Sequence, residues 1–149
     1  MRTVAIAMAA VSLTLAGALA AQNIGYTPDP KWVVPAEDAA KVNPLAGKRA
    51  LAIGGRRLYR KNCIECHGED GSGLVKKHAA DLQLPVVQKQ SDGALFWKIT
   101  NGNTDRGMPS FSKLPELERW QMILYLRNLA AVPTAGTTPA APTNPPDKK

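Results

Sequence analysis

Both cysteines of this 149-residue chain fall in one pentapeptide, Cys63-Ile64-Glu65-Cys66-His67. Two thiols three positions apart can form thioether links to the two vinyl groups on one edge of a haem, and the next residue can then turn its imidazole onto the iron. A chain that attaches a haem in this way has to fold around a large rigid group. We therefore expect one haem, bound covalently at Cys63 and Cys66, with His67 as an axial ligand of the iron.

Three other interpretations of the motif compete with haem attachment. A zinc site would need two further ligands, but His78 is the only other histidine, and adjacent Cys66 and His67 fit poorly on one tetrahedral ion. A thiol–disulfide oxidoreductase usually carries its cysteine pair on a thioredoxin-like βαβ pattern, which this sequence lacks. A Cys63–Cys66 disulfide would close a very short loop and stabilise the fold little.

The N-terminus has the pattern of an export signal. Arg2 is followed by an uncharged, Ala-rich run that continues to Gly25 and contains the small-x-small site Ala18-Leu19-Ala20. We expect a signal peptide over residues 1–20 with cleavage after Ala20, and hence a periplasmic protein. An uncleaved membrane anchor is the alternative, because the run is nearly long enough to span a bilayer.

Composition divides the rest of the chain into three parts. Residues 21–46 are rich in proline with little periodicity and predict an extended arm. Residues 47–130 form one small predicted domain. Residues 131–149 are mainly Ala, Thr and Pro, a composition that predicts disorder.

Three helices are predicted in the central domain. The first covers residues 47–62. The second begins at an N-cap, Ser91 or Asp92, and ends at Gly102. The third covers residues 115–130. No strand pair is evident, so we expect an all-α fold with long loops wrapped round the haem.

The apolar residues predict how these helices pack. Gly55 shares a face with Leu51, Leu58 and Tyr59, and glycine is costly inside a helix. Its place on that face predicts close approach of another helix. The third helix is apolar on two sides, so we expect it to be covered on both. One side holds Leu117, Trp120, Ile123 and Leu124, and the other holds Met122, Leu126 and Leu129.

The second axial ligand must come from elsewhere, and Met108 is the favoured candidate. Met8 lies in the export signal, Met122 sits mid-helix where methionine usually packs, and His78 lies in a polar stretch. Met108 stands in the constrained segment Arg106-Gly107-Met108-Pro109-Ser110-Phe111. Such a loop can present a side chain to the opposite face of the haem.

Taken together, these stretches resemble the class I monohaem cytochromes c, in particular the short bacterial periplasmic ones. The likeness covers about residues 43–130. The matching stretches are Gly55-Arg56-Arg57-Leu58-Tyr59, Cys63-Ile64-Glu65-Cys66-His67-Gly68, Ser91 to Gly102, Gly107-Met108-Pro109-Ser110-Phe111, and Trp120 through Arg127.

The resemblance implies a fold in which the first and last helices cross. It places Gly55 and Tyr59 at that crossing, against the helix that carries Trp120 and Tyr125. The sequence departs from the family at Gly73-Leu74-Val75, where relatives often have a proline near the carbonyl that receives the other imidazole N–H of the proximal histidine.

Either Pro85 replaces the family's proline at a later point in the chain, or the carbonyl of another residue accepts the N–H of His67. The carbonyl that pairs with His67 is therefore left open by the sequence.

Iron with both axial positions occupied has no open site for a substrate. We therefore expect a periplasmic one-electron carrier that cycles between ferrous and ferric haem c, and not an enzyme. If Met108 were not bound, open iron could support peroxidase-like or gas-binding chemistry, but no distal histidine is evident. The other alternative is a haem c subunit or module of a membrane or dehydrogenase complex.

The net positive charge of the chain indicates which partners it can attract. The formal net charge is +7, and loss of Arg2 with the signal, which holds no acid, leaves +6. The simpler interpretation of the basic cluster is a solvated helix face, and a docking patch for an acidic redox partner is the alternative. We expect a monomer with donor and acceptor proteins as partners and no nucleic acid. The cluster comprises Lys48, Arg49, Arg56, Arg57, Arg60 and Lys61.

Overall fold

The computed structural model describes residues 25–130, and the predicted signal peptide and C-terminal tail lie outside this range. Three helices dominate the described part: α2 (Ala52–Asn62), α5 (Asp92–Asn101) and α6 (Glu116–Leu129). Within residues 25–130 no strand forms, and the sole β-type pairing is an isolated bridge between Asn103 and Met108. The all-α prediction is confirmed.

The predicted ends of these helices agree closely with the structure. The first predicted helix begins as a 3-10 turn, η1 (Arg49–Leu51), before α2. The Ser91 hydroxyl accepts a hydrogen bond from the Ala94 amide at 3.1 Å and so caps α5. Gly102, at φ 69°, ends α5, because this left-handed region favours glycine.

Five shorter elements were not predicted. They are α1 (Ala36–Ala39), α3 (Ile64–His67), η2 (Val75–Lys77), α4 (Pro85–Gln88) and η3 (Thr104–Arg106). Each has three or four residues, which is too short to show a helical period in the sequence. They divide the predicted loops into short, sharply turned segments.

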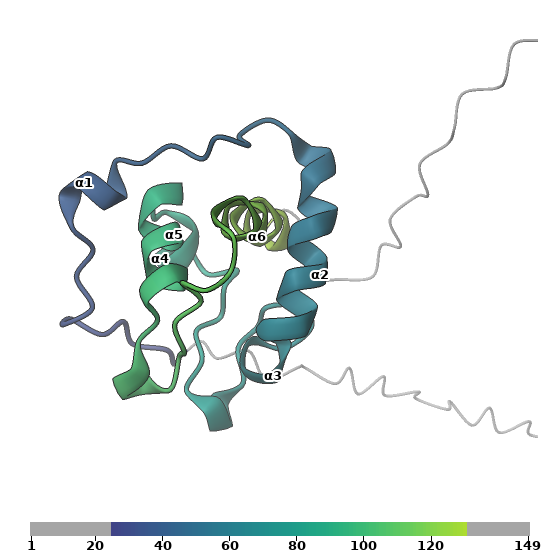
Figure 1. Cartoon of the computed structure of the whole chain (residues 1–149). Helices are drawn as coiled ribbons and strands as arrows, with labels where there is room; N and C mark the ends of the chain where they lie inside the picture. Colours follow the sequence, from purple (N-terminus) through teal and green to yellow (C-terminus); the bar gives the residue numbers. More distant parts are fainter. Residues whose placement is uncertain (1–24, 131–149) are drawn as a thin grey trace, which may run out of the picture.

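Helix α6 is covered on two sides, as its two apolar faces predict. Figure 1 shows α6 almost end-on between α5 and α2. A Cβ added at Gly55 would overlap the backbone carbonyl of Gln121, so the backbones of α2 and α6 touch at this point. The predicted close approach at Gly55 is confirmed.

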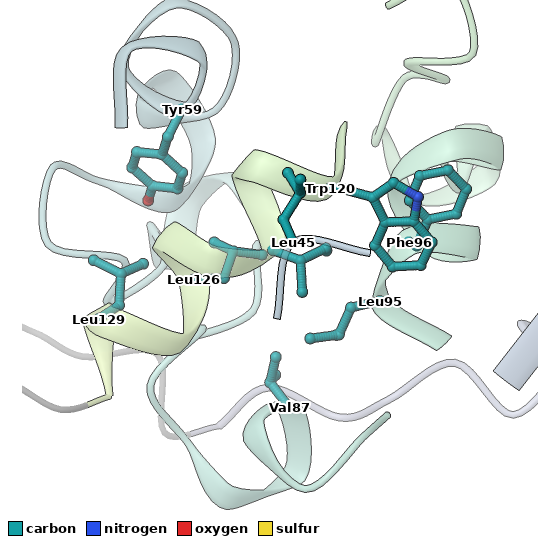
Figure 2. Packing of buried hydrophobic residues seen from close by; sticks show 9 residues of the cluster. Leu45, Tyr59, Val87, Leu95, Phe96, Trp120, Leu126 and Leu129 are labelled. Carbon is teal, nitrogen blue, oxygen red and sulfur yellow. The ribbon is translucent and has the colours of Figure 1, made fainter. Parts of the chain in front are cut away.

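Aromatic contacts join α6 to both neighbours, and Figure 2 shows the core that they help to form. Trp120 stacks on Phe96 of α5, with ring centroids 3.9 Å apart and an interplanar angle of 15°. Tyr125 meets Tyr59 of α2 at 5.1 Å. Leu117, expected on an apolar side of this helix, is instead 58% exposed.

The segment predicted as an extended arm is more structured than its prolines indicate. It contains α1, whose backbone carbonyl at Asp38 lies where a side chain on Gly93 of α5 would be. Asn43 is buried and donates a hydrogen bond to the Trp120 carbonyl at 3.3 Å. Leu45 belongs to the hydrophobic core. The arm therefore packs against the domain along much of its length.

Gly55→Ala should destabilise the protein with haem bound by about 1–3 kcal/mol, the usual cost of overpacking, because the added methyl meets backbone that cannot move alone. A lower midpoint in urea or thermal unfolding would measure this loss.

Gly54→Ala is the matched control. Its methyl meets the flexible side-chain end of Gln121, and alanine favours the helix by up to about 1 kcal/mol. Equal midpoints for the two variants would contradict the backbone contact at Gly55.

Candidate functional site

The pentapeptide forms a single helical turn at the end of α2. The Cys63 amide donates to the Tyr59 carbonyl at 2.8 Å, which continues the hydrogen bonding of α2. The Cys63 carbonyl then accepts from the amides of Cys66 and His67, at 3.1 and 2.9 Å, and so begins α3. No disulfide joins the two cysteines. This turn places the two thiols and the imidazole together in the wall of one cavity.

The cavity is large and is walled by elements from the whole domain. The space between atoms amounts to about 1230 Å³, including its opening to solvent. Helices α5 and α6 form its inner wall, and the loop after α5 and the N-terminal arm form further walls. Residues from each wall include Cys63, Cys66, His67, Leu95, Ile99, Met108, Met122, Tyr26 and Trp32.

His67 is oriented by a backbone carbonyl. Its Nδ1 lies 3.0 Å from the carbonyl oxygen of Ala80, so the N–H is on Nδ1 and Nε2 keeps its lone pair. Burial lowers the pKa of His67, which favours the neutral ring. The open question about this carbonyl is answered by Ala80, whereas Pro85 begins α4.

Gly73 allows this carbonyl to approach. It has φ 72°, and a Cβ there would overlap the carbonyl oxygens of Ala79 and Ala80. The Gly73 amide donates to the His67 carbonyl at 2.9 Å, which folds the loop back onto α3. The departure from the family pattern at residues 73–75 thus coincides with a tight crossing of two backbone segments beside His67.

The thiol chemistry of the site disfavours the competing interpretations. Burial, with the neighbouring Cys66, raises the pKa of the Cys63 thiol to about 12, whereas reactive redox cysteines have lowered pKa values. Within residues 25–130, no three His, Cys, Asp or Glu side chains converge as metal ligands. The raised pKa of Cys63 thus disfavours a redox dithiol, and the side chains of this range form no zinc site.

Met108 reaches the cavity from a braced loop. The Asn103 amide donates to the Met108 carbonyl at 2.8 Å, and the Met108 amide donates to the Asn103 carbonyl at 2.9 Å. Between them, η3 and Gly107, at φ 82°, form the turn. The Phe111 amide donates to the Ile99 carbonyl at 3.1 Å, which anchors the other end of the loop to α5.

Two of the other candidate ligands also line the cavity. Met122 projects from α6 and is only 2% exposed. His78 lies at the end of η2 with φ 52° and is exposed, as its polar surroundings predict. Met8 lies outside the described residues. The structure thus brings Cys63, Cys66, His67 and Met108 to one cavity, with Met122 and His78 beside them.

No role for Trp32 is predicted from the sequence, although it is the one tryptophan of the proline-rich arm. Trp32 lines the cavity, and its buried Nε1 has no hydrogen-bond acceptor among residues 25–130. The Lys98 ammonium lies 4.6 Å from the centre of its ring, and burial lowers the pKa of this lysine. A buried donor beside a cation suits a carboxylate, and haem carries two propionate carboxylates. Trp32 and Lys98 therefore suit the propionates of a haem, as the two cysteines suit its vinyl groups.

Comparison with known proteins agrees with this site. The family model described as cytochrome c oxidase, cbb3-type, subunit III matches residues 50–126, more than half of the chain. No solved structure matches the chain significantly. The matched range contains the pentapeptide, Met108, helices α2 and α5 and most of α6, whereas the N-terminal arm lies outside it. The chain therefore belongs to the family of cytochrome c oxidase, cbb3-type, subunit III, and is a class I c-type cytochrome with one haem.

Proposed function

We propose that this protein is a periplasmic one-electron carrier whose haem c is linked to Cys63 and Cys66, with the iron held by His67 and Met108. The observation that carries this proposal is that all four side chains, from two separate segments, line one cavity. When bound, the haem supplies an iron that alternates between the ferrous and ferric states.

The protein's own residues set the conditions for this chemistry. The Ala80 carbonyl accepts the Nδ1–H of His67 and so leaves the lone pair of Nε2 to hold the iron. Met108 contributes a soft thioether, which favours ferrous iron and raises the reduction potential relative to two histidines. Two axial side chains leave no position for a substrate, so the site supports electron transfer and not catalysis.

A second candidate function follows from the family description. The matching model is named for a subunit of a cbb3-type oxidase, so a haem c module of a membrane complex is the alternative to a free carrier. Within residues 25–130, no helix has the length and hydropathy needed to cross a bilayer. Fractionating cells that express the full chain distinguishes the two: a free carrier is released with the periplasm, and a complex subunit copurifies with membrane proteins.

Covalent attachment at the pentapeptide gives the first prediction for this function. Protein made with a working cytochrome maturation system should keep its haem through denaturing electrophoresis, detected by in-gel haem staining. Cys63→Ala/Cys66→Ala should lose the stain, because no other cysteine exists in the chain. Stained bands from the double variant would exclude the proposed thioether links.

Removing the distal ligand should convert the carrier into a ligand-binding haem protein. Met108→Ala leaves the covalent links and His67 in place, so haem should be retained. The vacated position should bind carbon monoxide or imidazole, and the reduction potential should fall. The readouts are the sulfur-to-iron charge-transfer absorption, ligand titration and a redox titration.

Met122→Leu is the control for this experiment. It keeps core volume and should preserve both the charge-transfer band and the resistance to exogenous ligands. If Met108→Ala keeps the band while Met122→Leu loses it, Met122 is the distal ligand.

The basic residues beside the haem attachment point give a charge prediction. Arg57, Arg60 and Lys61 are exposed on α2, close to Cys63. Oxidation of the ferrous protein by hexacyanoferrate(III) should slow as salt rises, because surface attraction is screened over about 8 Å at physiological ionic strength. Lys61→Glu should reduce both the rate and its salt dependence more than Lys113→Glu, on the loop after α5, although the two variants change the net charge equally. Equal effects of the two variants would mean that the rate depends on net charge and not on a local basic patch.

A further inference from the structure

The loop that carries Met108 is tied to the N-terminal arm through one carboxylate. Asp29 accepts a hydrogen bond from the Asn103 side-chain amide at 2.9 Å. The Arg106 guanidinium lies 3.7 Å from the same carboxylate, and it also donates to the Thr27 carbonyl at 3.0 Å. Asn103 and Arg106 belong to the turn that leads into Met108. The arm therefore holds this loop by two hydrogen bonds and one ion pair.

The Asp29 carboxylate is itself held in place. Its other oxygen accepts from the Lys31 amide at 3.0 Å, and the Trp32 amide donates to the Asp29 carbonyl at 3.1 Å. Its side chain is only 15% exposed. The hydrogen bond from Asn103 is the main cause that lowers the pKa of Asp29, in keeping with a carboxylate that stays ionised. We call the contacts of Asp29 with Asn103 and Arg106 the clasp.

Asn103 connects this clasp directly to the backbone of Met108. The side chain of Asn103 binds Asp29, while its main chain makes both hydrogen bonds of the bridge to Met108. A movement of Met108 away from the cavity has to break this bridge or displace Asn103 from Asp29. The contact between Asn103 and Asp29 therefore opposes one of the two ways in which the Met108 backbone can leave the cavity.

We infer that Asp29 is a positioning residue for the distal ligand: by clasping Asn103 and Arg106, it limits how often Met108 leaves the iron. The inference rests on the proposed function, since it requires Met108 to be that ligand. The arm lies outside residues 50–126, the range of the family match, so Asp29 acts on the Met108 loop from a segment that the match does not include.

The expected effect follows from a population argument. An exogenous ligand binds only molecules whose Met108 is displaced, so its apparent dissociation constant is the intrinsic value divided by the displaced fraction. Loss of hydrogen bonds to a charged group should raise that fraction by about tenfold or more. Ferric Asp29→Ala protein with haem bound should therefore bind imidazole tighter by the same factor. Without imidazole, it should still show the sulfur charge-transfer band.

Two further variants separate positioning from general destabilisation. Asp29→Asn keeps an oxygen that can accept from Asn103 but loses the charge that attracts Arg106, so its imidazole affinity should fall between wild type and Asp29→Ala. Asp38→Ala removes another arm carboxylate, which pairs with Lys41 within the arm. Its imidazole affinity should equal that of wild type.

The outcomes separate this inference from the proposed function. If Met108→Ala binds imidazole tightly but Asp29→Ala has wild-type affinity, the clasp is refuted and methionine ligation stands. If Asp38→Ala raises the affinity as much as Asp29→Ala does, the effect is general loosening of the arm, and the clasp is again refuted. If Met108→Ala keeps the charge-transfer band, the proposed ligation itself fails.

Discussion

The contact between α2 and α6 at Gly55 holds the rest of the site in register. Because the two backbones touch there, the C-terminal end of α2 has one position relative to α6. The pentapeptide follows immediately from that end. Tyr59, one turn after Gly55, extends the contact, since its ring meets Tyr125 and its hydroxyl donates to the Gly68 carbonyl at 2.7 Å. The helix crossing thus fixes both the attachment turn and the start of the loop that follows it.

The loops depend on this frame because they contribute little core of their own. The loop after α3 returns to the site through backbone hydrogen bonds, including one from Leu74 to the Cys66 carbonyl at 2.9 Å. It delivers the Ala80 carbonyl to His67. The loop after α5 is held at Ile99 and delivers Met108. A bound haem would pack against both loops, and binding to the folded state adds to its stability.

The N-terminal arm completes the site on the side that the family match does not cover. Trp32 supplies a buried N–H without an acceptor in the described part of the chain, and Asp29 clasps the turn that leads to Met108. Further along, Asn43 and Leu45 anchor the arm to α6 and the core. The family-matched range thus supplies the attachment turn and the loop that carries Met108, and the arm supplies contacts that brace that loop.

The sequence by itself determined the features with a local chemical signature. The pentapeptide, an N-cap at Ser91 or Asp92, the stop at Gly102 and the glycine on the apolar face of α2 each depend on neighbours within about one or two helical turns, which a single sequence displays. The structure then shows that Ser91 is the cap. The choice of Ala80 over Pro85, the clasp at Asp29 and the place of Trp32 on the cavity had no such signature. Each joins residues far apart in the chain through a backbone carbonyl or a single side chain, and any polar residue of the loops could have met those partners. Only the tertiary structure, by fixing which segments cross, decides which of them do.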